Sequence, residues 1–253
     1  MELYIIFHEV LYEKNTSSFT DSELHRIVRW VAVNEAIPKK IPDWLPKVCL
    51  LEEYSLPIYD PLQQMSNFYQ NSFFFHLAKN PGIVRSEYVG FAQYDMNLPA
   101  ELFRAIEAKI LEQGVPTVYG MYPYPFEALY SNPLPPSDWQ ELLRLYNSHS
   151  STTHEFDTLK KLPLFLCHTF ILPMRVFIEC MKFVEKTIPF CLRKLGWNTR
   201  HLAGTFERVI AIAISCKILE GKLQNMIHVK GIDHLASQHT ADPLRGLKAG
   251  LAD

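Results

Sequence analysis

Short apolar runs with strand propensity alternate along this chain with segments of helical periodicity, and no other feature constrains the fold as strongly. The strand-like runs lie at residues 3–8, 48–51, 88–92 and 117–121, and the helical patterns between them lie at 62–78 and 99–113. Strands that alternate with helices form a parallel or mixed sheet with helices on both faces. We therefore predict a single Rossmann-like α/β domain that spans residues 1–253.

The remaining segments continue this pattern. Polar residues at 12–21 predict a mobile loop, and a helix is expected from Ser22 through Val31, with Ser22 as its cap. The serine-rich residues 148–153 predict a loop that closes over a ligand. Further on we expect helices at 138–147, 175–186 and 205–219, a strand at 162–172, and a surface tail at 228–253.

The strand-like run at residues 87–96 ends abruptly in polar side chains. Gly90 lets another backbone or a ligand approach, and Gln93, Tyr94 and Asp95 follow where a buried strand would emerge from the sheet. In open α/β sheets ligands bind outside the carboxyl ends of the strands. Asp95 is therefore a candidate for holding a cation or a sugar, and the alternative is an aspartate that caps the next turn.

Composition describes a globular protein and excludes several classes. The net charge of -2 provides no basic field for nucleic acid. The odd number of cysteines, five, without metal-binding spacing, predicts reduced thiols and a cytoplasmic location. No window approaches the roughly 20 apolar residues of a membrane span, and the start of the chain lacks the features of a signal peptide.

Several blocks, taken in order, resemble a family of capsular-polysaccharide glycosyltransferases. The blocks are Phe7-His8-Glu9, Tyr88-Val89-Gly90-Phe91 with Gln93-Tyr94-Asp95, Thr169-Phe170-Ile171, and Gly204-Thr205-Phe206-Glu207-Arg208. In bacterial members a basic segment follows the strand and a serine precedes the Glu-Arg pair. Here Ala92-Gln93-Tyr94-Asp95 and Phe206 replace them, a variant similar to glycosyltransferases of large DNA viruses such as algal chloroviruses.

The resemblance implies the GT-A fold, a nucleotide-binding α/β domain that takes a sugar from a nucleotide donor. It implies a nucleotide-sugar half at about 1–121 and an acceptor half at about 122–227. In GT-A enzymes an acid at the end of a central strand usually holds a divalent metal on the donor diphosphate, within an Asp-X-Asp motif. This chain offers only Gln93-Tyr94-Asp95. Asp95 is the candidate ligand for Mn²⁺ or Mg²⁺, both of which prefer oxygen ligands.

The tail supplies candidate second ligands for that metal. These are His228, His234 and His239, of which we take His228, and the alternative is that they are ordinary exposed residues.

Glu207 is the candidate general base for an acceptor hydroxyl. The sequence places it in the first turn of the helix expected at 205–219, where Thr205 would be the cap. An acid in a first turn also stabilises a helix by itself, and Glu207 has Arg208 or Arg200 as alternative ion-pair partners.

His8 and Glu9, after the first strand, are expected to contact the base and ribose of the nucleotide, although His8 equally suits a routine strand end. Arg85, Arg200 and Arg208 are candidate diphosphate clamps, because guanidinium forms paired hydrogen bonds with phosphate oxygens, or else members of surface ion pairs. Candidates for the acceptor side, each of which also suits a core position, are Tyr122, Tyr124, His168, Trp197 and His201.

Together these observations predict an inverting glycosyltransferase, a hexosyl- or pentosyltransferase, that moves a sugar from a UDP-sugar to a glycan or glycoprotein acceptor. A viral enzyme of this kind would act in the host cytoplasm. Two alternatives stay open. One is a methyltransferase or other nucleotide-dependent enzyme, which the absence of a glycine-rich loop after residues 3–8 disfavours. The other is a non-catalytic carbohydrate- or protein-binding module of the same fold.

Overall fold

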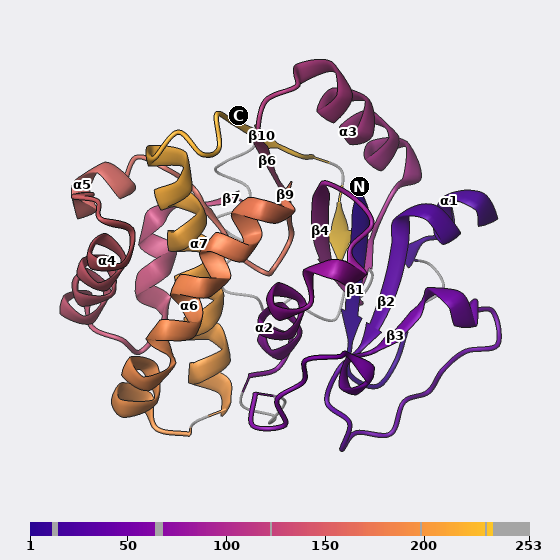
Figure 1. Ribbon diagram of the computed structural model, residues 1–253, viewed down its shortest axis with the longest axis horizontal. Helices are drawn as coiled ribbons and strands as arrows, with labels where there is room; N and C mark the ends of the chain where they lie inside the picture. The colour runs from indigo at the N-terminus through magenta and orange to yellow at the C-terminus, as the bar shows by residue number, and fades with distance from the viewer. Residues whose placement is uncertain (12–14, 64–67, 122, 198, 231, 235–253) are drawn as a thin grey trace.

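A seven-stranded sheet forms the centre of the computed structural model, which describes residues 1–11, 15–63, 68–121, 123–197, 199–230 and 232–234 (Figure 1). Its order is β10-β6-β9-β4-β1-β2-β3, and β9 alone runs antiparallel to its neighbours. The predicted mainly parallel α/β sheet is therefore confirmed. The strands are β1 (Glu2–Phe7), β2 (Val28–Ala32), β3 (Leu50–Glu52), β4 (Tyr88–Gln93), β6 (Thr117–Gly120), β9 (Phe170–Pro173) and β10 (Asn225–His228).

Two small antiparallel pairs flank this sheet. They are β5 (Met96–Asn97) with β11 (Asp233–His234), and β7 (Pro123–Tyr124) with β8 (Leu164–Phe165). The α-helices are α1 (Asp21–Ile27), α2 (Asn71–Lys79), α3 (Ala100–Gln113), α4 (Pro136–Ser150), α5 (Phe156–Leu159), α6 (Met174–Leu195) and α7 (Thr199–Leu219). Short 3₁₀ turns are η2 (Lys47–Cys49), η3 (Glu53–Ser55), η4 (Pro81–Ile83) and η5 (Phe126–Ser131).

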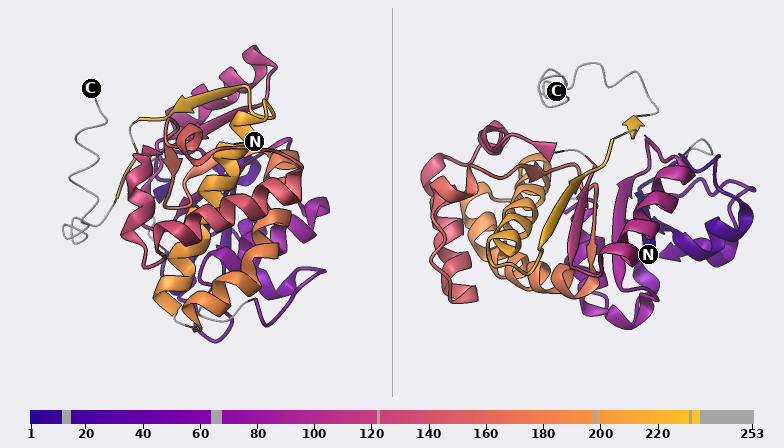
Figure 2. Two further views of the ribbon diagram at one scale, coloured as in Figure 1. Left: turned by 90° about the vertical axis from the view of Figure 1, so that its left-hand side faces the viewer. Right: turned by 90° about the horizontal axis from the view of Figure 1, so that it is seen from above.

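Helices cover both faces of the sheet, as Figures 1 and 2 show. Helices α1 and α3 lie together and are joined by two ion pairs, Arg26 with Glu107 at 2.7 Å and Arg104 with Glu23 at 2.5 Å. Helices α2, α6 and α7 pack against one another over the opposite face. Ordinary amphipathic packing therefore encloses the parallel strands on both sides.

Aromatic rings fill the interface between the sheet and α2. Phe91 of β4 lies with its ring centroid 4.5 Å from Phe74 of α2 and 5.0 Å from Phe177 of α6. Phe73 and Phe75 of α2 are buried too, as the sequence predicts, although α2 begins only at Asn71. Close ring pairs of this kind, one edge-to-face and one tilted, favour one arrangement of the layers.

The largest difference from the sequence prediction lies at residues 22–31. Helix α1 ends at Ile27, and Val28 begins a strand that pairs in parallel with β1 and β3. Thr20 caps α1 instead of Ser22, because the Thr20 hydroxyl accepts from the amide of Glu23 at 3.3 Å and the Glu23 carboxylate accepts from the Thr20 amide at 2.9 Å. Apolar residues spaced three and four positions apart also fit a strand that is buried on both faces. Residues 28–32 form such a strand.

Other boundaries differ in ways that shape the site. The strand expected at 162–172 is divided into β8 and β9 by the turn 166–169. Residues 148–150 belong to α4, so the serine-rich segment is in part helical. Asn15, in the segment expected to be a mobile loop, is fully buried and donates to the carbonyl of Met96 at 2.7 Å. An edge strand of the main sheet, β10, ends where the predicted surface tail begins, and the described part of that tail contributes β11, which pairs with β5.

Neighbouring side chains leave no room for a Cβ atom at the two glycines of the strands, Gly90 and Gly120. A Cβ on Gly90 would lie 2.8 Å from Cγ1 of Ile171, so the close approach that the sequence predicts there is made by a side chain of β9. A Cβ on Gly120 would lie 1.9 Å from Cε1 of Phe165, which is buried.

We predict that Gly120→Ala lowers the free energy of unfolding by about 2 kcal/mol, because Phe165 must leave its place in the core. Urea unfolding measures the change. Gly82→Ala is the matched control, since no heavy atom lies within 4 Å of the position that its methyl group would take, and its stability should stay near that of the parent. Equal stability of the two variants would refute the packing role of Gly120.

Candidate functional site

The order of the strands places a crevice at the carboxyl ends of β1 and β4. Strand β1 has β2 on one side and β4 on the other, so the chain changes direction across the sheet at this point. Ligands of open α/β sheets bind at such switch points. Ile6 pairs in register with Gln93, and the residues that leave these two strands therefore emerge side by side at one edge.

The antiparallel β9 carries a tight turn to the same edge. Cys167 and His168 both have left-handed backbone conformations, with φ of 60° and 49°. The side-chain amide of Gln93 donates to the Cys167 carbonyl at 3.0 Å, and the Tyr124 hydroxyl lies 3.5 Å from the Cys167 sulfur. Two consecutive non-glycine residues at positive φ store backbone strain, which is characteristic of functional sites.

A pocket of about 150 Å³ joins this turn to α2 and α7. It unites Gln93 and Glu207, two residues singled out from the sequence, with His168, a sequence candidate for the acceptor side. The sequence does not single out Asn71 and its neighbours, because it places them inside the helix expected at 62–78, whereas α2 begins at Asn71. The lining residues are Tyr69, Gln70, Asn71, Gln93, His168, Ala203, Gly204 and Glu207.

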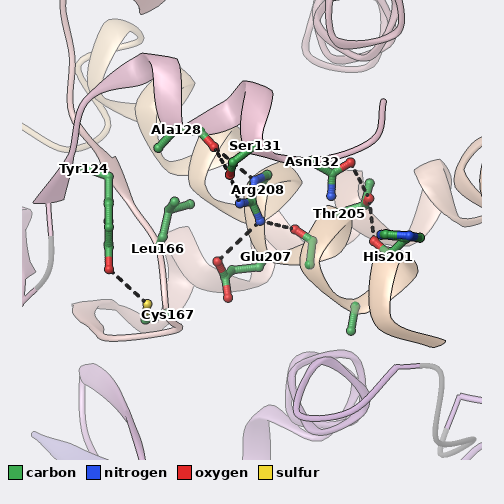
Figure 3. Close-up of polar contacts among 12 residues, drawn as sticks. Tyr124, Ala128, Ser131, Asn132, Leu166, Cys167, His201, Thr205, Glu207 and Arg208 are labelled. Atoms are coloured by element: carbon green, nitrogen blue, oxygen red, sulfur yellow. Dashed lines mark hydrogen bonds and ion pairs between the residues drawn. The ribbon is translucent and has the colours of Figure 1, made fainter. Parts of the chain in front are cut away.

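Glu207 reaches the pocket from the third turn of its helix. Because α7 begins at Thr199, the expectation that Glu207 occupies the first turn is wrong. Thr205, the expected cap, instead donates to the His201 carbonyl at 2.8 Å within the helix. The Glu207 side chain is 20% exposed and its carboxylate lies 3.8 Å from Nη1 of Arg208 (Figure 3). The helix dipole therefore does not explain a catalytic role, whereas the partly buried position in a pocket supports one.

Arg208 fastens α7 to the η5 segment. Its guanidinium donates to the carbonyls of Gly204 at 2.9 Å and Ala128 at 3.3 Å, and to the Ser131 hydroxyl at 2.6 Å (Figure 3). Arg208 is therefore a buried residue engaged by protein oxygens and not a member of a surface ion pair, the alternative that the sequence left open.

The other two candidate clamps are Arg85 and Arg200. Arg85 precedes β4 and lies at the opposite, amino-terminal edge of the sheet, where its amide donates to Glu2 at 2.8 Å. This position removes Arg85 as a candidate clamp. The side chain of Arg200 lies outside the described residues.

His8 and Glu9 leave β1 in different environments. His8 is partly buried, and its ring lies edge-on to Tyr69 of the pocket at 5.5 Å. Burial, with a smaller effect of Lys39, lowers the pKa of His8 to about 4, so the ring is neutral at physiological pH. Glu9 is exposed and forms an ion pair with Lys40 at 2.8 Å. His8 is therefore placed to contact a ligand in the crevice, and Glu9 has a partner at the surface.

A second pocket, of about 250 Å³, opens at the carboxyl ends of β2 and β3. Lys39 in its wall donates to the carbonyl of Asn34 at 2.6 Å, and the Tyr54 hydroxyl donates to Glu52 at 2.5 Å. Both pockets lie along the same edge of the sheet, on either side of the end of β1, which His8 follows. The lining residues are Ala32, Glu35, Ile37, Pro38, Lys39, Glu52 and Tyr54.

Asp95 follows β4 and is buried, with 5% of its surface exposed, and Tyr94 beside it is half-buried. The β5–β11 pair sets the backbone of His234 opposite Met96, directly after Asp95. His228 is exposed at the end of β10, three strand positions from β4, or about 14 Å. His239 lies outside the described residues. Of the candidate histidines, His234 has the backbone position next to Asp95.

Ligand sets for a metal and membrane-spanning helices were searched in the described part of the chain. No group of three or more His, Cys, Asp or Glu residues there is arranged to hold a metal ion. Among the described helices, none combines the length and the apolar character needed to cross a bilayer.

His168 is the pocket residue whose altered pKa bears directly on how the stability of the fold depends on pH. Burial lowers its pKa to about 3, from an ordinary value of 6.5. Between these values the unfolded chain binds one more proton at this residue than the folded chain, so this contribution to stability is full above pH 6.5 and is lost as the pH falls.

We predict that His168→Gln makes the decline in unfolding free energy from about pH 6 to pH 4 shallower by about 1.4 kcal/mol per pH unit. Urea unfolding at several pH values measures both slopes. His25→Gln, at an exposed position of α1, is the control and should keep the parental slope. A parental slope in His168→Gln would show that His168 is not held neutral by the fold.

Comparison with known proteins gives only distant similarities. No family model and no curated protein sequence matches the chain. Similar solved structures include glucosyl-3-phosphoglycerate synthase from Mycobacterium tuberculosis in complex with Mn²⁺, UDP and glucosyl-3-phosphoglycerate, with 9% identity, a TM-score of 0.42, and coverage of 99% of this chain and 78% of that chain. The same enzyme with Mn²⁺, UDP and phosphoglyceric acid matches with 10% identity, a TM-score of 0.37, and coverage of 99% and 77%. At this level the similarity assigns no family and no activity to the chain.

Proposed function

We propose that this chain is a GT-A-type glycosyltransferase that moves a sugar from a UDP-sugar to a hydroxyl group of a glycan acceptor. One observation carries the proposal: Gln93 at the end of β4 and Glu207 of α7, far apart in sequence, line one pocket at the switch point of a mainly parallel sheet. The ordered sequence blocks that resemble capsular-polysaccharide glycosyltransferases contain both residues. The site and the resemblance therefore point to the same pair.

The donor side of the proposed site lies along the ends of β1, β2 and β4. The pocket beside Lys39 and Tyr54 is placed to take the nucleoside, with His8 between it and the pocket of Glu207. Asp95 supplies a carboxylate, the donor type that Mn²⁺ and Mg²⁺ prefer, and His234 has the adjacent backbone position. A divalent cation bound there would neutralise charge on the diphosphate.

Glu207 acts as the general base in this proposal. The acceptor hydroxyl gives its proton to the Glu207 carboxylate, and its oxygen forms a bond to the anomeric carbon of the donor sugar. The bond from that carbon to the UDP oxygen breaks, and UDP leaves with the bonding electrons. Attack from the side opposite UDP inverts the configuration. Arg208, 3.8 Å from the carboxylate, holds the base in place through its own bonds to η5.

We predict that Glu207→Gln lowers the kcat of transfer by about 10²-fold or more, because the amide cannot accept the proton. Release of UDP in the presence of a responsive acceptor measures the rate. The Kd for UDP should change less than about twofold, since Glu207 contacts the acceptor in this scheme.

Glu101→Gln, at an exposed acid of α3, is the matched control and should keep parental kcat. Near-parental transfer by Glu207→Gln would remove Glu207 as the base and leave donor binding to be explained by other residues.

We also predict that UDP-sugars raise the melting temperature and that Mn²⁺ increases this shift. A ligand at about 100 times its Kd adds about 2.7 kcal/mol to the stability of the folded chain. In Asp95→Asn the side-chain shape is retained and the charge is lost, so the dependence on Mn²⁺ should disappear. Thermal shift with a panel of UDP-sugars, with and without Mn²⁺, makes the measurement.

The same panel separates the alternatives. A methyltransferase would respond to S-adenosylmethionine and not to UDP-sugars, and a binding module without turnover would respond to a free sugar and not to UDP. If UDP-sugars bind and Asp95→Asn keeps the full effect of Mn²⁺, the assignment of Asp95 to the donor side is wrong.

A further inference from the structure

Two polar side chains in the wall of the Glu207 pocket are buried with hydrogen-bonding capacity left over. Asn71 is 1% exposed and His168 is 5% exposed. Within the described part of the chain, no hydrogen-bond partner is found for Oδ1 of Asn71 or for Nδ1 of His168. Buried polar atoms are normally satisfied, because leaving one unpaired is costly. Two such atoms belong to residues that line one pocket.

The protein fixes the orientation of Asn71. Its side-chain nitrogen donates to the carbonyl of Phe68 at 2.9 Å and to the carbonyl of Ala203 at 3.2 Å. Both amide hydrogens are therefore used, and the oxygen remains as an acceptor. These two bonds also connect the start of α2 to α7, which carries Glu207. Asn71 thus ties the start of α2 to the helix of the candidate base, and both residues line the same pocket.

The protein also fixes His168. Its ring packs edge-on against Phe74, with ring centroids 4.7 Å apart and an interplanar angle of 88°. Its backbone belongs to the strained turn that the Gln93 amide holds through the Cys167 carbonyl. Burial keeps the imidazole neutral at physiological pH, so one ring nitrogen donates and the other accepts. His168 therefore suits a partner that can both donate and accept.

The chemistry of the lining selects the ligand. An acceptor oxygen, a neutral imidazole and the Glu207 carboxylate offer no positive charge to a phosphate or a carboxylate, whereas a hydroxyl group can bond to all three. The volume of about 150 Å³ lies below the roughly 300–1,000 Å³ of pockets for drug-sized ligands, which fits a single ring. The diphosphate of a donor is therefore excluded from this pocket, and a neutral sugar ring is favoured.

We propose that Asn71 and His168 form a subsite for the acceptor, which binds the hydroxyl groups of one uncharged sugar ring and sets it beside Glu207. This inference rests on the proposed function and deepens it, since it names the acceptor as a neutral sugar. Asn71 and His168 are binding residues in this scheme, and Glu207 takes the proton.

The test measures binding of methyl glycosides of glucose, galactose, mannose and xylose to the full chain by saturation-transfer NMR titration, with UDP binding measured in parallel. We expect at least one of these neutral probes to bind. His168→Phe and Asn71→Ala should each weaken that binding about tenfold, the effect of one lost hydrogen bond, and should leave the Kd for UDP within about twofold. His25→Phe and Asn225→Ala, at exposed positions, are the matched controls and should bind as the parent does.

Stability gives a second readout that a purely structural role would not produce. His168→Phe removes a buried nitrogen without a partner among the described residues but places a bulkier side chain at positive φ, so its melting temperature should stay near that of the parent while sugar affinity falls. Asn71→Ala also removes two hydrogen bonds of the fold, so His168→Phe decides the outcome if Asn71→Ala does not fold. His168→Gln, which keeps a hydrogen-bonding group, should recover part of the affinity.

Three results would overturn the subsite: parental sugar affinity in His168→Phe, tighter binding of glucuronate than of methyl glucoside, or no binding of any neutral probe by the parent. Failure of the proposed function looks different. If UDP and UDP-sugars do not bind while neutral sugars bind and His168→Phe loses them, the subsite stands in a carbohydrate-binding module.

Discussion

The insertion of one antiparallel strand, β9, between β4 and β6 determines where the candidate site forms. Because β9 runs against its neighbours, its first residue pairs with the last residue of β6, and Ile171 pairs with Gly90. The turn before it therefore lies at the carboxyl edge of the parallel strands, beside Gln93. An additional parallel strand in this place would have begun at the opposite edge. The two strand glycines admit the side chains of Ile171 and Phe165 that this arrangement brings in.

Strong local signals in the sequence predict much of the fold. Apolar runs predict the strands β1 and β4. End signals predict the helix α3, which ends just before Gly114, a residue in the left-handed conformation. Segment 28–31 could not be assigned this way, because apolar spacings of three and four suit both a helix and a strand buried on two faces. The register with β1 and β3 decides between them, and that is a long-range property.

The candidate site is predictable only in part for a related reason. Asp95 and Gln93 follow from their place after a buried strand, and Glu207 from its place in a late Glu-Arg pair. The other properties of the site depend on tertiary contacts. Arg208 bonds to η5, and among the described residues polar atoms of Asn71 and His168 have no partner. No local pattern in residues 62–78 distinguishes Asn71 from an ordinary residue inside a helix. That distinction requires the hydrogen-bond partners of each atom.

The distribution of charge along the crevice separates two tasks that sugar transfer requires. Lys39 donates to two backbone carbonyls, Lys40 pairs with Glu9, and Arg208 bonds to η5, so each of these cations already has protein partners. In the proposed mechanism, a cation held by Asp95 would neutralise the diphosphate at this edge. The Glu207 pocket, in contrast, combines a carboxylate with neutral polar groups. Electrostatics would thus direct a donor diphosphate and a neutral acceptor to different parts of one crevice, before shape complementarity contributes.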